Sequence, residues 1–271
     1  MKVAIQGIQG AFHHIVASDY FDDSMQLAEC LTFDEMPKLL VDNKVDYLVM
    51  AIANSIAGAI LPNYALLDEY NLQIEGEVFL PIKHQFMALP EQNIMAIKEV
   101  WSHPMAINQC RVFLRKYSHI KVVEKADTAA AAKDIFTKQL KGIAAIASTK
   151  AAAIYNLNIL AKDIQTNPDN YTRFFILKKE LVAQTNYNKV SIKFITNHNK
   201  GSLAEVLNIF IKYNLNLSKI QSLPIIHAPW KYSFFTDLLV ENTKDFDNAL
   251  AELSKIVQEV KILGKYTNTN N

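Results

Sequence analysis

The chain has 271 residues, of which 50% are apolar and 20% are charged, and its formal net charge is +1. The length favours one large domain or two smaller ones, and the apolar fraction is that of a globular protein. A nucleic-acid-binding or membrane-surface protein usually has an excess of basic residues, which this chain does not have. No apolar stretch is long enough to span a bilayer. We therefore expect no nucleic-acid partner and no membrane partner.

The start of the chain and its cysteines indicate a cellular compartment. MKVAIQGIQG runs directly into a strand-like segment and a glycine turn, without the apolar region of a signal peptide. Cys30 and Cys110 are far apart and lie in unlike contexts, which favours reduced thiols over a disulfide framework. These features predict a soluble, cytoplasmic protein.

The first part of the chain alternates strand-like and helix-like segments. Short apolar runs occur at 2–6, 45–53 and 143–148, and a helix-like segment follows each of them. An alanine-rich helix is expected from Thr128 onward, because Asp127 and Thr128 are good N-cap residues. Strands separated by helices predict an α/β domain with largely parallel sheets.

The C-terminal part has a different pattern. A polar stretch at 178–189 is expected to end one domain and to link it to the next. The following segments predict the order βαββαβ of a ferredoxin-like module, with strands and helices at 190–196, 202–214, 215–225, 231–241, 245–260 and 260–266. The helix at 202–214 is expected to bury one face, formed by Leu203, Val206, Leu207, Phe210 and Ile211. The boundary between the two domains is expected near Lys189, and the tail at 267–271 is expected to fray.

Several kinds of active site are not supported by the sequence. His13 and His14 are adjacent, so their side chains do not converge on one ion, and the chain has no CxxC or HExxH motif. We expect no metal site. Cys110 lies in an apolar, helix-like stretch and is expected to be a core thiol. The glycines of GIQG, at 7–10, predict only a tight strand-to-helix turn.

Small polar residues recur where an apolar run gives way to a helix-like one. These junctions lie at 9–11, 54–55, 102–103, 127–128 and 148–149. In an open α/β sheet such junctions meet along one edge, where helix N-termini favour an anion. Each junction taken alone is explained by helix capping, but the set favours a site for a small carboxylate.

The stretch NYTRFFIL, at 170–177, supplies a cation and a hydroxyl in adjacent positions. Arg173 could bind a carboxylate through two hydrogen bonds, while Thr172 could donate a proton or a hydrogen bond. The alternative is an edge strand whose arginine forms a surface ion pair. The stretch DYLVMAIANSIAGAI, at 46–60, similarly brings the uncharged pair Asn54 and Ser55 to the end of a buried strand.

Together these segments resemble the prephenate dehydratase family over essentially the whole chain. GIQGAFHH is similar to the opening turn of the family, MAIANSIAG to its PIENSxxG segment, and WSHPMAINQCRVFL to its SHPQALxQCRxFL segment. DTAAAA and IAAIAS match later turns of small residues, and NYTRFFIL is similar to the TRF motif. GSLAEVL and NLSKIQSLP lie where the family's ACT regulatory module has GALxxxL and NLTKIESRP.

The resemblance implies a two-lobed α/β catalytic domain of the periplasmic-binding-protein type, at 1–182, and a ferredoxin-like ACT domain, at 189–266. Prephenate would bind in the cleft between the lobes and lose carbon dioxide and its ring hydroxyl, giving phenylpyruvate for phenylalanine biosynthesis. No cofactor would be required, because aromatisation of the ring drives the reaction. The family motif implies that Thr172 assists the departing hydroxyl, with Arg173 beside it.

The resemblance also implies residues that bind the substrate and the effector. Substrate-binding residues would be Ala11, Asn54, Ser55, Ser102, His103, Gln109, Thr128 and Ser148. Phenylalanine would bind to the ACT domain between two subunits of a homodimer or homotetramer, at Gly201, Ser202, Leu203, Asn216, Gln221, Ser222, Leu223 and Pro224. Gln221 and Leu223 depart from the family, which usually has Glu and Arg there. Feedback inhibition by phenylalanine is expected.

Ala53 is a further departure, because the family usually has Glu immediately before Asn54. Loss of this carboxylate predicts reduced activity and leaves open a weakened homologue that acts as an amino-acid sensor. An arogenate dehydratase is a second alternative, which these motifs do not separate from a prephenate dehydratase. A cytoplasmic solute-binding protein is a third, which the Thr-Arg-Phe segment and the ACT-like tail disfavour.

Overall fold

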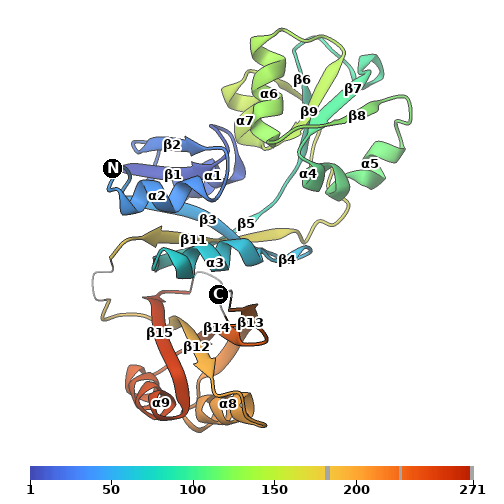
Figure 1. The fold of residues 1–271 in the computed structure, drawn as a ribbon. Helices are drawn as coiled ribbons and strands as arrows, with labels where there is room; N and C mark the ends of the chain where they lie inside the picture. The colour runs from blue at the N-terminus through green and yellow to red at the C-terminus, as the bar shows by residue number, and fades with distance from the viewer. Residues whose placement is uncertain (181–183, 226–227, 269–271) are drawn as a thin grey trace. The chain divides into compact units, whose positions relative to one another are not determined.

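The computed structural model describes residues 1–180, 184–225 and 228–268 (Figure 1). It divides into two compact units, the first formed by Met1–Gly58 and Phe79–Phe174, and the second by Ala59–Val78 and Phe175–Asn271. This division cuts across the domain boundary expected from the sequence, so the boundary near Lys189 stays a prediction. The expected linker and tail lie partly outside the described residues. No helix in the described part of the chain is long and apolar enough to cross a membrane.

The first sheet has the strand order β2-β1-β3-β11-β5, with the short β4 paired to β3. Its strands are β1 (Lys2–Gln6), β2 (Gln26–Cys30), β3 (Tyr47–Asn54), β4 (Gly58–Ala59), β5 (Gln73–Pro81) and β11 (Tyr171–Lys178). β1 pairs in parallel with both β2 and β3, and its centre is fully buried. The helices of this part of the chain are α1 (Phe12–Phe21), α2 (Glu35–Val41) and α3 (Leu61–Glu69).

The second sheet lies entirely in the first unit and has the order β10-β6-β9-β7-β8. Its strands are β6 (Gln85–Ala88), β7 (Glu99–Ser102), β8 (Lys121–Glu124), β9 (Ile143–Ala147) and β10 (Asn158–Ala161). The helices are η1 (Ile94–Ala96), α4 (Pro104–Gln109), α5 (Arg111–Arg115), α6 (Thr128–Thr137) and α7 (Thr149–Ile154).

The expectation of largely parallel sheets is wrong for this second sheet, which is mixed. β7 pairs in parallel with β8 and β9, but β6 is antiparallel to both β9 and β10. The physical reason is that parallel neighbours need a crossover connection. β6 instead follows β5 after a link at 82–84 and enters its sheet without a preceding crossover helix. The prediction of an α/β fold is confirmed, because helices alternate with the strands of both sheets.

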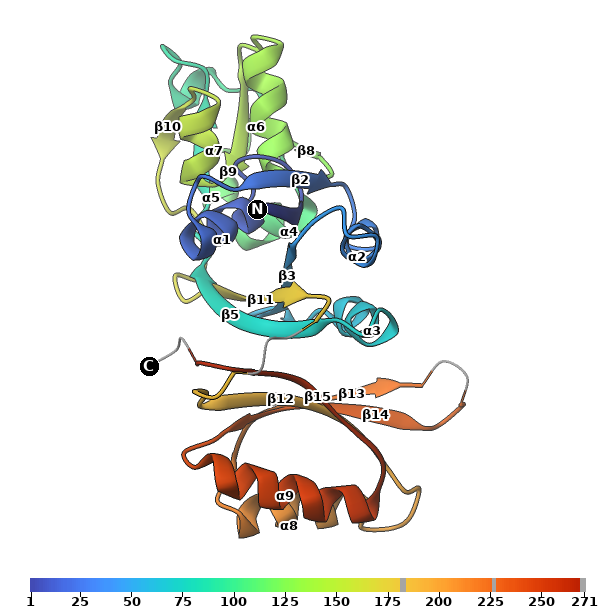
Figure 2. The ribbon, with the colours of Figure 1, turned by 90° about the vertical axis from the view of Figure 1, so that its left-hand side faces the viewer.

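The C-terminal segment forms an antiparallel sheet of order β13-β14-β12-β15 with two helices on one face (Figures 1 and 2). Its elements are β12 (Lys189–Thr196), α8 (Ser202–Lys212), β13 (Asn216–Pro224), β14 (Tyr232–Leu239), α9 (Thr243–Ile256) and β15 (Val257–Tyr266). Val190, Ile192 and Phe194 of β12 belong to the apolar core that the helices cover. The order βαββαβ confirms the predicted ferredoxin-like fold and agrees with an ACT domain.

Two local expectations in this segment are wrong. Ile211 was expected on the buried face of α8, but it is 75% exposed, whereas Ile209 is 6% exposed. The helix therefore presents a face rotated toward Ile209. The helix expected at 245–260 ends at Ile256, because Val257 has an extended backbone and begins β15, where it pairs with Thr196.

The second unit also contains the segment at 59–78, which contacts the face of the C-terminal sheet opposite its helices. Alternate residues of β12 point to that face, where Lys189 binds Glu77 and Lys193 binds Asp68. A side chain at Gly264 of β15 would collide with the main chain of Ile74, so this close approach requires a glycine.

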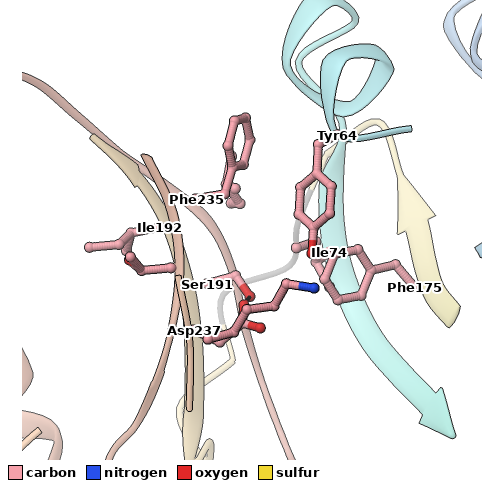
Figure 3. A pocket seen from close by; sticks show the side chains of 10 residues that line it. Tyr64, Ile74, Phe175, Ser191, Ile192, Phe235 and Asp237 are labelled. Carbon is pink, nitrogen blue, oxygen red and sulfur yellow. Dashed lines mark hydrogen bonds between the residues drawn. The ribbon is translucent and has the colours of Figure 1, made fainter. Parts of the chain in front are cut away.

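Figure 3 shows the side chains at this contact, with Tyr64, Ile74 and Phe175 facing Ser191 and Asp237. Ser191 Oγ donates to Asp237 Oδ1 at 2.5 Å and shares a hydrogen bond of 2.7 Å with the Tyr266 hydroxyl. The cavity that they line has a volume of about 10 Å³, which is room for one water molecule. The contact is therefore close-packed around a polar centre.

Candidate active site

Thr172 lies at the start of β11, beside the end of β3. Its Oγ1 accepts a hydrogen bond from Asn54 Nδ2 at 3.0 Å. Ser55 fixes the same corner, because its N–H donates to Tyr171 O at 2.8 Å and its Oγ accepts from Tyr171 N at 2.9 Å. Strand pairing thus brings together residues that lie more than a hundred positions apart. Of the predicted site residues, Asn54, Ser55 and Thr172 are neighbours here.

Asn54 is held by the turn that follows β3. Its side-chain Oδ1 accepts from the backbone N–H groups of Ile56 and Ala57, at 3.0 and 2.9 Å. This Asx-type turn ends the strand and turns Nδ2 toward β11. An amide serves both purposes, because it offers an acceptor to the turn and a donor to Thr172. The polar interruption of the apolar strand is therefore a local requirement of the turn as well as part of the site.

Two buried polar residues extend this cluster. Asn54 Nδ2 also donates to Asn170 Oδ1 at 2.7 Å, and Asn170 Nδ2 donates to Gln109 Oε1 at 3.0 Å. His84 Nε2 lies 2.8 Å from the same Gln109 Oε1. Gln109, predicted from the helix-like segment after Ser102, is thus joined to Thr172 through Asn170 and Asn54.

A pocket of about 340 Å³ adjoins this cluster and is large enough for a small organic acid. Gln109 and Asn170 belong both to its wall and to the hydrogen-bonded cluster. Its remaining wall is mostly uncharged, and the lining residues include Ile56, Met105, Asn108, Arg111, Gln165 and Asn167. Arg111 is an exposed cation on this wall, and it forms no ion pair with any residue that the structure describes.

Arg173, the neighbour of Thr172 on β11, is 6% exposed, and its guanidinium carbon lies 5.6 Å from the centre of the Phe79 ring. Neighbouring residues on a strand point to opposite faces. Thr172 and Arg173 are therefore adjacent in the backbone, as expected, but their side chains point to opposite faces of the sheet. A catalytic role for Arg173 stays a prediction.

A second group of predicted residues lies where the turn after β1 meets α7. Ser148 is 1% exposed, and its Oγ donates to Gly10 O at 2.6 Å and accepts from Ala151 N at 3.0 Å. A side chain at Gly10 would lie within 2.9 Å of the Ala151 Cβ, so the turn needs this glycine. Ala11 is packed in an apolar cluster with alanines of α6 and α7. The Ser148 hydroxyl therefore both donates and accepts a hydrogen bond at the contact between the turn after β1 and α7.

A third group lies at the carboxyl end of β7 and at the start of α6. Ser102 is fully buried and its Oγ donates to Ile146 O at 2.6 Å, while His103 Nδ1 caps α4 by accepting from Met105 N at 3.2 Å. Asp127 caps α6 and precedes Thr128. Burial raises the pKa of the Asp127 carboxyl, although hydrogen bonds from the first turn of α6 oppose the shift. The capping role expected for Asp127 is confirmed.

The thiols and histidines set aside on sequence grounds are core residues. Cys110 is fully buried in an apolar cluster, and burial raises its pKa to about 12. Burial also raises the pKa of Cys30, to about 11. His13 Nε2 accepts from Ala51 N at 3.3 Å, and His14 Nδ1 accepts from Gly10 N at 2.9 Å. Within the described residues no group of histidines, cysteines and carboxylates is arranged to hold a metal ion.

The residues expected to bind the effector lie on two elements of the C-terminal segment. Gly201 has a positive φ of 89° and precedes α8, and Ser202 Oγ donates to Asn197 O and Asn199 O, at 2.6 and 2.7 Å. Leu203 is half-buried and packs against the apolar core of this segment. The other set, Asn216 and 221–224, belongs to β13, an edge strand of the sheet. Leu223, at the position where the family usually has Arg, is 9% exposed.

Sequence reasoning missed His84, Asn170 and Arg111 as members of the site. His84 is 2% exposed and Asn170 is 1% exposed, so both are polar side chains inside the fold. The available signal was a lone histidine entering an apolar strand in PIKHQFMAL, and an asparagine directly before Tyr171 and Thr172. Either pattern is common in structural positions, so only the hydrogen bonds reveal the connection to Thr172.

Known proteins and a family model are similar to this chain over most of its length. Residues 3–182 match the family model described as prephenate dehydratase. The chain is 34% identical over 268 residues to the bifunctional chorismate mutase/prephenate dehydratase of Aquifex aeolicus, covering 98% of this chain and 73% of that protein. It is 36% identical over 278 residues to the chloroplastic arogenate dehydratase/prephenate dehydratase 2 of Arabidopsis thaliana, covering 98% of this chain and 72% of that protein.

Among solved structures, prephenate dehydratase from Arthrobacter aurescens in complex with L-Phe superposes with a TM-score of 0.89 at 26% identity. The superposition covers 100% of this chain and 91% of that chain. The sequence matches and the shared fold together show that the chain belongs to the prephenate dehydratase family.

Proposed function

We propose that the protein catalyses the decarboxylative dehydration of prephenate to phenylpyruvate, a carbon–oxygen lyase step of phenylalanine biosynthesis. The observation that carries this proposal is the hydrogen bond from Asn54 Nδ2 to Thr172 Oγ1. Because the threonine oxygen accepts from Asn54, its own proton is available to another acceptor. The hydroxyl that leaves the substrate ring is such an acceptor.

The reaction balances with one proton that is taken up from the solvent. The bond between the ring and its carboxylate breaks and releases carbon dioxide, and its electron pair completes the aromatic ring. The ring hydroxyl leaves and, with one proton, becomes water. Thr172 donates a hydrogen bond to the departing oxygen and assists the arrival of that proton. A threonine hydroxyl is a weak acid, so its contribution depends on accurate placement inside the site.

The substrate has two carboxylates, and the pocket beside the Thr172 cluster offers one cation on its wall. In our proposal Arg111 binds one carboxylate and the amides of Gln109 and Asn170 contact the ligand. Support comes from the place of Arg111 on the pocket wall and from its having no ion pair among the described residues. Asn54, Ser55, Ser102, His103, Thr128, Ser148, Ala11 and Arg173 remain proposed site residues on the strength of the family motifs.

The test is turnover of prephenate by the purified protein, followed as phenylpyruvate by its absorbance in alkali. Thr172→Ala is expected to lower kcat by roughly a hundredfold, since positioned proton donation contributes about that much or more, whereas Thr172→Ser keeps the hydroxyl. Arogenate is assayed in parallel, because the Arabidopsis thaliana relative is named for both activities. No product above the spontaneous background from either substrate would exclude the enzyme and favour a sensor.

We further propose regulation by phenylalanine at an interface between ACT domains of a homodimer or homotetramer in the cytoplasm. Support comes from the shared fold with the complex that contains L-Phe and from the matching loop at Gly201 and Ser202. The side chains of Gln221 and Leu223 lack the charges usual in the family, so we expect weaker coupling between binding and activity. Titration calorimetry with phenylalanine, together with light scattering with and without the ligand, tests both statements.

A further inference from the structure

A continuous row of side-chain hydrogen bonds leads from His84 to Thr172. It runs from His84 to Gln109, then to Asn170, then to Asn54, and ends at the Thr172 hydroxyl. The heavy-atom distances are 2.8, 3.0, 2.7 and 3.0 Å in that order. We call these residues the amide row. It joins a histidine that the proposed mechanism does not use to the residue that the mechanism requires.

The direction of the row is fixed at its Asn54 end. A backbone N–H can only donate, so the N–H groups of Ile56 and Ala57 require the oxygen of the Asn54 amide, at 3.0 and 2.9 Å. Nδ2 must then face the other way, toward Asn170 and Thr172. Because Nδ2 is a donor, Asn170 must present its oxygen to it and Thr172 must accept through Oγ1.

The same reasoning propagates to His84. Because the Asn170 oxygen accepts from Asn54, the Asn170 nitrogen Nδ2 faces Gln109. Gln109 must therefore accept this hydrogen bond through Oε1. An oxygen facing His84 Nε2 requires that this nitrogen carry the proton. The neutral imidazole therefore has its hydrogen on Nε2 and a bare lone pair on Nδ1. Main-chain donors beside β3 thus determine the tautomer of a histidine in the link before β6.

The surroundings of His84 agree with this assignment. The side chain is 2% exposed, and no described residue forms a hydrogen bond with Nδ1. The Phe12 ring packs edge-to-face on the imidazole, with 5.4 Å between the two ring centroids. Burial lowers the pKa of the imidazole, although the bond to Gln109 opposes the shift, so the neutral form is favoured. The main chain is held on both sides, because His84 N donates to Gln165 Oε1 and Ile164 N donates to His84 O, each at 2.9 Å.

We propose that His84 is a positioning residue for the dehydration. Its Nε2–H holds the Gln109 oxygen in place, which keeps Asn170 and then Asn54 in the orientation that donates to Thr172. The Thr172 proton is thereby directed away from the protein and toward the departing hydroxyl of the substrate. The proposal rests on the proposed function, and it adds a residue that contacts neither the substrate nor the reacting atoms.

Without the His84 donor, the orientation of the amides in the amide row would no longer be fixed at its Gln109 end. Gln109 could then rotate and offer its nitrogen to Asn170, whose amide would have to turn over in response. Asn54 could not follow, because its oxygen remains bound to Ile56 and Ala57. Two donors would face each other between Asn170 and Asn54, and the geometry at Thr172 would be disturbed.

The test compares His84→Leu with His84→Gln, whose terminal amide can restore a donor, and with His198→Leu, an exposed histidine in the second unit. We expect His84→Leu to lower kcat on prephenate by roughly tenfold or more, about the worth of one buried hydrogen bond, with KM changed less than about threefold. His84→Gln should recover most of the loss, and His198→Leu should match the wild type. Thermal unfolding of each variant separates loss of turnover from loss of the fold.

A second arm tests whether His84 acts through Thr172. In a Thr172→Val background, which has no hydroxyl to position, His84→Leu should cause little further loss. Nitrogen NMR of the wild type should show the proton of His84 on Nε2. Equal losses in both backgrounds, a proton on Nδ1, or an unchanged kcat in His84→Leu would each overturn the proposal. A wild-type protein without turnover would instead overturn the proposed function, and the NMR spectrum would still decide the tautomer.

Discussion

Ala53 is half-buried on β3, one residue before Asn54, which donates to Thr172. The family usually has a glutamate at this position, so the site here lacks a carboxylate next to its donor amide. A carboxylate could assist proton transfer or orient a neighbouring cation. Its absence is a departure from the family motif that concerns a single side chain next to the proposed site.

Ala53→Glu is therefore expected to raise kcat on prephenate by about tenfold, a modest share of what a positioned acid–base group supplies. Steady-state kinetics of the variant check this result. Ala153→Glu, which adds the same group at an exposed position of α7, should leave kcat unchanged. If kcat does not rise in Ala53→Glu while the variant stays folded, the site has another arrangement that compensates for the missing carboxylate.

His13 predicts how stability depends on pH. It is buried, accepts from Ala51 N, and has a pKa lowered by desolvation from 6.5 to about 3. Below about pH 6.5 the unfolded chain binds a proton that the native protein does not, so stability is lost as the pH falls toward 3. The expected loss from this group is up to about 1.4 kcal/mol per pH unit.

Urea unfolding between about pH 7 and pH 5 measures this loss. His13→Leu removes the titrating group and should flatten the dependence by roughly 1 kcal/mol per unit, even if the variant is less stable overall. The exposed His119→Leu variant should keep the wild-type slope. An unchanged slope in His13→Leu would mean that His13 binds a proton equally well in the native and unfolded states, which would contradict its lowered pKa.

At the scale of elements, several helices of the first unit begin at a residue whose side chain caps the helix. Asp127 caps α6, His103 caps α4 and Ser148 caps α7, each through a side-chain acceptor. These starts were predictable, because capping depends on the residues next to the helix. The sequence could not indicate that the Ser148 hydroxyl also binds Gly10 O, since that partner is 138 positions away.

Ser148→Ala removes both of these hydrogen bonds. The expected cost is about 2 kcal/mol of unfolding free energy, from one lost cap and one lost buried bond. Asn242→Ala is the matched control, because it removes only an exposed cap at α9 and should cost about 1 kcal/mol or less. Chemical denaturation gives both values. A raised KM for prephenate without loss of stability would instead support the predicted role of Ser148 in substrate binding.

At the scale of the whole molecule, the second unit is built from segments distant in the sequence. Glu77 has a fully buried side chain and binds Lys189 at 2.7 Å, across more than a hundred positions. Removing one partner of a buried pair takes away the compensation that it gives to the other charge. This pair therefore makes the integrity of the unit depend on both segments together.

Lys189→Met is expected to destabilise the protein by about 3–5 kcal/mol, whereas the double variant Lys189→Met with Glu77→Leu should recover most of that loss. Lys138→Met, which breaks an exposed pair with Asp134, should cost about 0.5 kcal/mol or less. Urea denaturation of the four proteins measures these differences. A double variant no more stable than Lys189→Met would show that the lysine stabilises the unit by other contacts.

The sequence by itself determined the family, the fold class and the identity of the residues expected to carry the chemistry. It could do so because short apolar runs, helix caps and the Ser-His-Pro and Thr-Arg-Phe segments depend on residues that are close along the chain. Asn54, Thr172 and Gln109 are therefore site residues that the sequence alone predicts. Ile211 and the end of α9 were misplaced, because the rotation of a helix and its last residue depend on what it packs against.

Only the tertiary structure decided which of these residues meet. The amide row requires the pairing of β3 with β11, and the link before β6 supplies its histidine. His84 and Asn170 look like ordinary polar residues in sequence, and their burial and partners give them a role. Hydrogen-bond direction passes from residue to residue in space, so a tautomer set beside β3 could not be predicted from the neighbours of His84 in the chain.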